Sequence, residues 1–137
     1  MGIGTAEKGK LGELHVFSKL IERGAMPFLP MADIKGVDAA VRKKDGTYVE
    51  IQVKTTERPE QRGWFNVPGL VPRENFFIVG IEVSEQGYEV WIFPSKVFAD
   101  YTTERRQLGL DSGVKKYGQR LRERLAEYRE NWDLLVI

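Results

Sequence analysis

The stretch GVDAAVRKKDGTYVEIQVKTT, residues 36–56, decides the fold of this chain. Apolar and polar residues alternate on both sides of Asp45-Gly46, which predicts a β-hairpin with strands at residues 37–43 and 47–55. A half-buried strand directs one face to the core and the other to water. Here the polar face carries acids, an amide and a lysine, which suggests a function for that face.

The register of this hairpin depends on the length of its loop. A two-residue loop, Asp45-Gly46, places Asp38 opposite Val53 and turns its carboxylate into the core. A three-residue loop, Lys44-Asp45-Gly46, gives the glycine a left-handed conformation and places Asp38 opposite Gln52. A shift of one residue moves every side chain to the other face, and only the longer loop separates apolar from polar residues. Beside the small side chain of Ala40, the predicted polar face then consists of Asp38, Glu50, Gln52 and Lys54.

Residues 5–23 predict a helix with a carboxylate in its apolar arc. The apolar side chains that share this arc are Leu14, Val16, Phe17, Leu20 and Ile21. Glu13 falls within the arc, and Lys10 falls near its edge. Burying a carboxylate without a partner is costly, so Glu13 needs a cation, a metal ion, or a salt bridge to Lys54 or Lys10.

The remaining elements alternate between extended segments and helices, which indicates one α/β domain over residues 1–137. In chain order we expect an extended segment at 26–34, an irregular loop at 56–74 with a short strand at Trp64–Val67, a second hairpin from 75–83 and 88–94, a short helix at Ser95–Ala99, an amphipathic helix at 114–130, and an apolar tail, LLVI, that forms a last strand or an oligomer contact.

Composition excludes several classes of site. The 137 residues include no cysteine, which excludes disulfide frameworks, thiolate zinc sites and cysteine nucleophiles. His15 is the only histidine, which excludes histidine-rich metal sites. No apolar run has the length of a signal peptide or a membrane span, so we expect a cytoplasmic protein that does not associate with membranes. The net charge of +1 means that any binding to nucleic acid must depend on local clusters of charge.

The predicted polar face favours a particular chemistry. Two or three oxygen-bearing side chains around a gap suit a hard divalent cation such as Mg²⁺ or Mn²⁺. A lysine beside them can orient a water molecule and stabilise charge on a phosphate. The residues that would take part are Glu13, Asp38, Glu50, Gln52 and Lys54.

This set of residues resembles the PD-(D/E)XK nuclease superfamily, including the archaeal Holliday-junction resolvases and other small nucleases of that fold. The family pattern places a glutamate on the first helix, an aspartate on one strand of a hairpin and (E/Q)-x-K on the next. The matching residues are Glu13 in GELHVFSKLIERG, Asp38 in GVDAAV, and Gln52-Val53-Lys54 in VEIQVKTT. The resemblance spans roughly residues 5–100. It implies a restriction-endonuclease-like α/β fold, with a hairpin-rich mixed central sheet flanked by an N-terminal and a C-terminal helix.

The resemblance also implies an activity, which is metal-dependent phosphodiester hydrolysis of DNA of the endonuclease type. By this resemblance Asp38 would be the direct metal ligand, and Gln52 or Glu50 would complete the ligand set. Glu13 would hold a ligand water or bind weakly, and Lys54 would orient the attacking water. Many small nucleases of this type pair to cut two strands, so the resemblance implies a homodimer.

Two features depart from the family pattern. Gln52 stands where an acid is usual, although part of the superfamily has glutamine there and its carbonyl oxygen can still bind a cation. The irregular segment 56–74 replaces the helix that usually follows the third strand. For DNA contacts, the basic residues near the hairpin and helix are Lys10, Arg42, Lys43 and Lys44. The alternative for Lys10 is a stem packed along the helix with its amine in water.

Two other functions fit the same sequence. A nuclease fold that has lost catalysis could act as a DNA-binding or assembly subunit, which the glutamine and the near-neutral charge favour. A protein-interaction module is favoured by the long loop 56–74 and the apolar tail 134–137. Dependence of DNA cleavage on a metal ion separates the first interpretation from these two.

Overall fold

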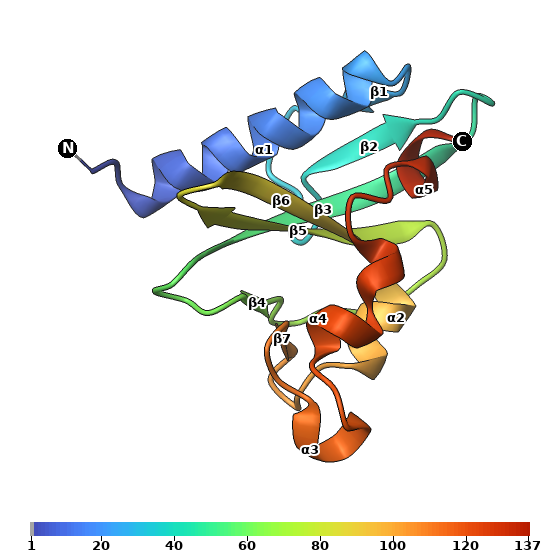
Figure 1. Cartoon of the computed structure of the whole chain (residues 1–137). Coiled ribbons are helices and arrows are strands. Elements are labelled where there is room, and N and C mark those ends of the chain that lie inside the picture. The colour runs from blue at the N-terminus through green and yellow to red at the C-terminus, as the bar shows by residue number, and fades with distance from the viewer. Residues whose placement is uncertain (1) are drawn as a thin grey trace.

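A five-stranded mixed sheet forms the centre of the computed structural model, which describes residues 2–137 (Figure 1). Its strands, in spatial order, are β1 (Met26–Phe28), β2 (Ala39–Arg42), β3 (Tyr48–Glu57), β5 (Phe76–Ser84) and β6 (Gly87–Pro94). Neighbouring strands are antiparallel except β3 and β5, which run parallel. Helix α1 (Thr5–Glu22) lies along one face of the sheet, and short helices in the C-terminal part of the chain pack beside the sheet, which confirms the predicted fold class.

The β2–β3 hairpin has the register of the three-residue loop. Ala40 pairs with Glu50, and Arg42 pairs with Tyr48. The amide of Lys43 donates a hydrogen bond of 2.8 Å to the carbonyl oxygen of Thr47, which closes the loop. Its glycine, Gly46, has a φ of 88°, the left-handed conformation that this turn requires. Alternation of apolar residues and one glycine therefore sufficed to predict which side chains share a face.

The first hydrophobic core lies between α1 (Thr5–Glu22) and the apolar face of the hairpin. Val16, Phe17 and Leu20 of the helix are buried in it, together with side chains of β2, β3, β5 and β6. Leu14 and Ile21 are each 53% exposed, so the helix contacts the sheet through a narrower stripe than the sequence predicts. Glu13 lies at the border of this stripe, with its side chain 25% exposed.

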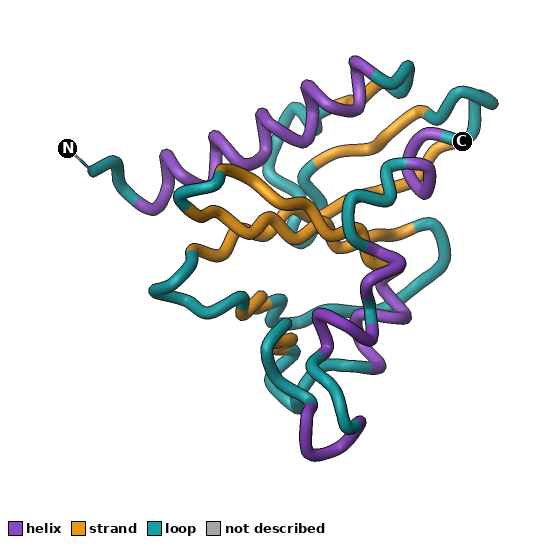
Figure 2. The backbone as a smooth tube through the Cα atoms, in the orientation of Figure 1, coloured by secondary structure: helices purple, strands orange, loops and turns teal. Residues whose placement is uncertain are grey.

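The second hydrophobic core covers the opposite face of the sheet. It includes β4 (Trp64–Asn66), β7 (Gln107–Gly109), which pairs with β4, and α2 (Ser95–Asp100). The ring of Phe65 lies on Gly80 of β5, where a Cβ atom would be 2.7 Å from the ring. The crossover from β3 to β5 carries β4 and no helix, as the irregular segment 56–74 predicts. Figure 2 shows this crossover as a long loop beneath the sheet.

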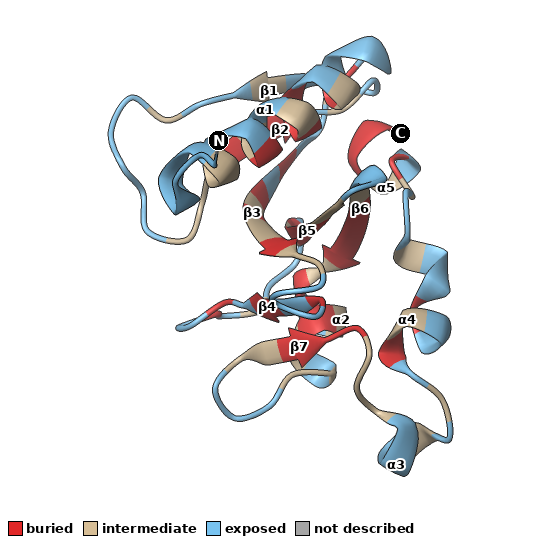
Figure 3. Cartoon of the chain, turned by 60° about the vertical axis from the view of Figure 1, so that its left-hand side comes forward, coloured by how far each residue is buried: buried red, intermediate tan, exposed pale blue. Residues whose placement is uncertain are grey.

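The predicted single helix over 114–130 is wrong. The chain forms four short elements in this region and after it: α3 (Val114–Tyr117), α4 (Leu121–Arg124), a 3₁₀ turn (Ala126–Tyr128) and α5 (Asp133–Val136). Gly118 has a φ of 72° and ends α3 after four residues. The apolar spacing nevertheless marked buried residues, because Leu121 and Leu125 enter the second core while Trp132 enters the first. Figure 3 shows this alternation of buried and exposed segments.

The apolar tail does not form the predicted strand, and its predicted oligomer contact stays a prediction. Residues 134–136 belong to α5, where Leu135 and Val136 are buried against the first core. The carbonyl oxygen of Val136 accepts a hydrogen bond of 2.8 Å from the amide of Lys44, at the tip of the β2–β3 hairpin. The tail therefore closes the first core within the same chain. Within residues 2–137, none of the helices combines the length and the apolar character that crossing a membrane requires.

Candidate functional site

The sheet opens between β2 and β3 at Asp38. Strand β3 continues to Glu57, but its pairing with β2 covers only Tyr48–Ile51. At the end of this ladder the amide of Asp38 donates to the carbonyl oxygen of Ile51 at 2.9 Å. Two residues further along β3, the amide of Val53 donates to Asp38 Oδ2 at 2.7 Å. The carboxylate of Asp38 thus takes the place of a strand partner, which fixes it at the opening.

Three hollows meet around this opening and share their lining residues. Glu13 and Asp38 line the first, of about 380 Å³, which we name the Asp38 hollow. Glu13 and Lys54 line the second, of about 290 Å³. Gln52 and Lys54 line the third, of about 450 Å³, which we name the Gln52 hollow. Glu13 thus joins the first hollow to the second and Lys54 joins the second to the third, although α1 packs on one face of β3 while Gln52 and Lys54 belong to the other.

A glycine next to Glu13 permits a close approach of helix and sheet. A Cβ atom on Gly12 would be 2.7 Å from Thr55 Oγ1 of β3 and 2.9 Å from Ile81 Cδ1 of β5. Both distances are shorter than any ordinary packing contact. Only glycine therefore allows α1 to lie this near the strand that carries Lys54, with Glu13 one residue away.

The charges at the opening are only partly paired. Lys10 Nζ lies 3.4 Å from Glu13 Oε1, and the Lys10 side chain is 63% exposed. A pair of this kind on a helix surface contributes roughly 0.3–0.5 kcal/mol. Within the part of the chain that the structure describes, Lys54 has no carboxylate within 4 Å. Its ammonium group is therefore not neutralised by a direct partner and can act on a bound phosphate or water.

Glu50 is not brought to the other predicted ligands. Its carboxylate forms an ion pair of 2.8 Å with Arg73, and it lines none of the three hollows. The hairpin places Lys43 and Lys44 near its tip, at the end away from Asp38, and Arg42 next to them. Of the four residues predicted to contact DNA, only Lys10 lines one of these hollows.

Few side chains at the opening could bind a metal ion, and all of them would do so through oxygen atoms. Over residues 2–137, no group of three or more histidine, cysteine, aspartate or glutamate side chains gathers as a metal site would. The set comprises the carboxylates of Glu13, Asp33 and Asp38, which line the Asp38 hollow, and the amide of Gln52 in the Gln52 hollow. Mg²⁺ often binds proteins through one or two carboxylates, with waters and substrate phosphates completing its shell. The donor set therefore fits an ion that is held jointly by protein and phosphate.

The sequence analysis missed Lys35 and Arg73, which line the Gln52 hollow. Both lie outside the regular elements, Lys35 before β2 and Arg73 before β5, so no periodic pattern marks them. A search for cations near the predicted hairpin could have found Lys35, three residues before Asp38. Nothing in the sequence signals Arg73, which reaches the site only through the crossover between the parallel strands.

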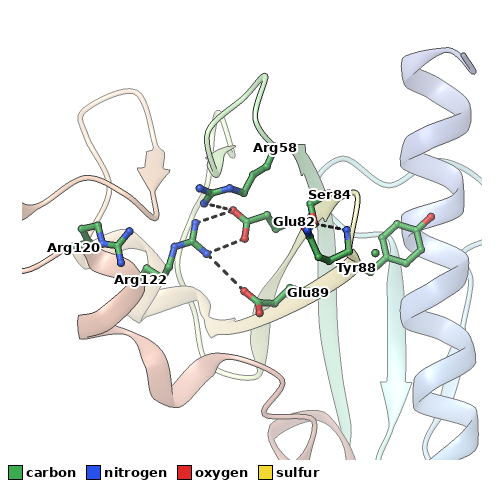
Figure 4. Close-up of a pocket in the computed structure, with 9 residues that line it drawn as sticks. Arg58, Glu82, Ser84, Tyr88, Glu89, Arg120 and Arg122 are labelled. Atoms are coloured by element: carbon green, nitrogen blue, oxygen red, sulfur yellow. Dashed lines mark hydrogen bonds and ion pairs between the residues drawn. The ribbon is translucent and has the colours of Figure 1, made fainter.

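A cluster of ion pairs surrounds Glu82, on the same face of the sheet as Lys54. Figure 4 shows Arg58 and Arg122 directed at the carboxylate of Glu82. Lys54 pairs with Gly80, and two positions further along β5 is Glu82, whose side chain is 5% exposed. Arg122 donates two hydrogen bonds of 2.8 and 2.9 Å to the carboxylate of Glu82, and Arg58 donates one of 3.1 Å. Asp111 accepts from the same two arginines. These four residues form a charge-balanced cluster that holds the end of β5 to the C-terminal segment.

The cluster shifts the pKa values of its acids downward. Burial alone would raise the pKa of Glu82, but the hydrogen bonds from Arg122 and Arg58 outweigh it and lower the pKa. Burial would likewise raise the pKa of Asp111, but the hydrogen bond from Arg122 outweighs it, so that this pKa is also lowered. The hydrogen bonds to Glu82 raise the pKa of Arg122. Arg120 and Arg122, which belong to the segment predicted as an amphipathic helix, thus form ion pairs within the protein.

We expect acid to weaken the fold through this cluster. A carboxylate whose pKa is lower in the folded than in the unfolded state stabilises the fold above its unfolded value and loses that effect as the pH falls through its folded value. The ordinary values are 4.5 for Glu82 and 3.8 for Asp111. The free energy of unfolding, measured with urea, should therefore be steady from pH 7 to about pH 5 and decline below it. Asp111→Asn removes one of the titrating groups and should show a smaller decline, and an identical decline would contradict the assignment.

Comparisons with known proteins bear on the fold. No protein-family model matches the chain, and no curated protein matches its sequence. Among solved structures, that of a bacterial homing endonuclease, I-Ssp6803I, superposes with a TM-score of 0.69 over 96% of this chain and 91% of that chain, at 22% sequence identity. At this identity the likeness concerns architecture. The chain shares its fold with a bacterial homing endonuclease.

Proposed function

We propose that this protein is a metal-dependent DNA endonuclease of the PD-(D/E)XK type, in the variant with glutamine before the lysine. The observation that carries the proposal is the convergence of Glu13, Asp38, Gln52 and Lys54 at the opening of the sheet. Its fold, which a homing endonuclease shares, supports a nuclease activity on DNA. The homodimer implied by the family resemblance remains part of the proposal, because two copies would place two such sites on one duplex.

The four residues would divide the work of phosphodiester hydrolysis. Asp38, Gln52 and Glu13 would hold Mg²⁺ or Mn²⁺, which as a Lewis acid supplies charge stabilisation and an activated water. Asp38 Oδ2 already accepts the Val53 amide, which orients the carboxylate and leaves Oδ1 for the ion. Lys54 would donate hydrogen bonds to the attacking water and to a phosphate oxygen, where negative charge develops.

The test is cleavage of supercoiled plasmid, branched DNA and single-stranded DNA by the purified protein with Mg²⁺ or Mn²⁺. Nicking or linearisation of at least one substrate is expected, and EDTA should abolish it. Failure to cut any of the three with either metal would refute the proposal. Sedimentation of the same preparation, alone and with duplex DNA, tests the homodimer.

A second candidate is a DNA-binding protein without catalysis. The observation that favours it is that, over residues 2–137, no three histidine, cysteine, aspartate or glutamate side chains gather closely enough to hold a metal ion. It predicts that DNA is retained equally with Mg²⁺ and with EDTA. The protein-interaction module loses one of its two supports, because the apolar tail packs inside the chain.

A further inference from the structure

The Gln52 hollow combines cations with an apolar wall. Its volume is about 450 Å³, and it lies between the loop that precedes β2 and the crossover that precedes β5. The charged groups that line it are Lys35, Lys54 and Arg73, and no carboxylate lines it. Leu70, Val71 and Phe76 form its apolar side. This composition suits a ligand that has an anionic group next to a flat or apolar one.

Arg73 is held rigidly at the rim of this hollow. Its guanidinium carbon lies 3.9 Å from the centre of the Phe76 ring, a cation–π contact. Its backbone makes two hydrogen bonds with the buried hydroxyl of Ser95, one of 3.0 Å from its amide and one of 2.8 Å to its carbonyl oxygen. An arginine fixed in this way can present its remaining N–H donors to an anion with little loss of conformational freedom.

Glu50 does not line the Gln52 hollow, but its carboxylate offsets part of the positive charge of Lys35, Lys54 and Arg73. It pairs with Arg73 at 2.8 Å, while Lys35 and Lys54 have no such partner among residues 2–137. The three cations and Glu50 together carry a net charge of +2, because three positive charges face one negative charge. An anion that enters the hollow therefore meets a positive local field on a chain whose overall charge is only +1.

We propose that the Gln52 hollow is a nucleotide subsite for the DNA strand that is cut. Lys35 and Arg73 bind a backbone phosphate next to the one that Lys54 contacts, and the sugar and base of that nucleotide lie against Leu70 and Val71. This inference rests on the proposed function, since it assigns the path of the strand on one side of the cleavage site. Val71, which is 69% exposed in the free protein, would become covered on binding.

The experiment measures DNA binding without a metal, by fluorescence anisotropy of a labelled duplex in EDTA over a range of salt concentrations. Each lost phosphate contact should reduce the slope of log K against log salt by about 1. Lys35→Ala and Arg73→Met should each weaken binding and reduce this slope, and Arg73→Met retains the apolar stem over Phe76. Lys115→Ala, on α3 and outside the three hollows, is the matched control and should leave the slope unchanged.

Three further variants separate the subsite from a general effect of charge. Glu50→Gln frees Arg73 from its carboxylate partner and should tighten binding. Val71→Glu places an acid at the apolar wall and should weaken binding, whereas Val71→Ala should change it little. Wild-type slopes for both Lys35→Ala and Arg73→Met, or no DNA binding by the wild-type protein, would overturn the inference.

The two proposals fail in different ways. If the wild-type protein binds DNA but cuts nothing with Mg²⁺ or Mn²⁺, the nuclease proposal fails while the salt slopes still decide the subsite. If it cuts, the subsite variants should raise KM more than they lower kcat, because they bind the substrate and the transition state alike. A loss confined to kcat in these variants would contradict a binding role.

Discussion

Asp38→Asn is expected to lower the rate of DNA cleavage by about 10²–10³-fold, the range that follows removal of one group that stabilises charge in a transition state. The free energy of unfolding should stay nearly unchanged, because the asparagine oxygen can still accept the Val53 amide that now bonds to Asp38 Oδ2. The substitution therefore removes the negative charge and keeps the hydrogen bond. Single-turnover cleavage and urea unfolding of the same preparation measure the two effects.

Asp38→Ala provides the contrast, because it removes both the charge and the acceptor. Val53 is 8% exposed, and an amide left there without a partner costs about 1–3 kcal/mol. This variant should therefore lose stability as well as cleavage. Equal cleavage rates in Asp38→Asn and the wild-type protein would show that the carboxylate serves only to cap the strand.

Lys54→Ala should also lower the cleavage rate strongly, by about 10²–10⁴-fold, the range for a positioned group that acts on a proton or a water. Lys115→Ala is its control, since it removes the same charge from α3, outside the three hollows. Retention of DNA binding in EDTA by Lys54→Ala would show that the loss concerns chemistry. Undiminished cleavage by both Asp38→Asn and Lys54→Ala would mean that the reaction occurs elsewhere on the protein.

The second large effect concerns stability and centres on Arg122. Arg122→Met removes one of the two arginines that pair with Glu82, whose side chain is 5% exposed, and leaves Arg58. Breaking a buried ion pair by removing one partner costs about 3–5 kcal/mol. The free energy of unfolding, measured with urea, should fall by an amount of this size. This is a large share of the roughly 5–15 kcal/mol that stabilises a typical domain.

Removing both partners should cost less than removing one. The double variant Glu82→Met with Arg122→Met leaves Arg58 and Asp111 paired at 2.9 Å, so that no buried charge lacks a partner. Lys19→Met is the control, because it breaks an exposed pair of 3.5 Å with Glu22, worth less than about 0.5 kcal/mol. A double variant that is as unstable as the sum of its single variants would refute the coupling. If Arg122→Met does not fold, Glu82→Gln measures a milder form of the same loss.

The part of the fold that sequence predicts best is the part that local patterns determine. The β2–β3 register follows from alternation and from the left-handed glycine at position 46, both of which are visible in the chain. Glu13 could be found because a carboxylate interrupts an apolar arc. These features depend on neighbours in the sequence, and for that reason they need no knowledge of the distant contacts.

The parts that sequence could not predict depend on contacts between distant segments. The apolar spacing over 114–130 is typical of one amphipathic helix. Here the same spacing has another cause, because several short turns bury their apolar side chains in two different cores. From the sequence alone, Glu50 could not be distinguished from the candidate ligand Gln52 on the same strand. Its ion-pair partner Arg73 lies in the crossover between β3 and β5, far away in the sequence. Lys35 and Arg73 themselves lie in loops, where function leaves no periodic signal.

The missing side chain at Gly12 has a consequence for how this centre could change. The approach of α1 to the sheet beside Glu13 depends on the absence of a side chain at position 12, where a Cβ atom would meet Thr55 and Ile81, and within residues 2–137 no ion pair joins Glu13 to Lys54. Larger residues at position 12, or altered volumes at positions 55 and 81, would lift α1 and widen the gap between acid and amine. Substitutions in an apolar layer would thus alter the proposed cleavage without replacing any residue to which we assign a part in it.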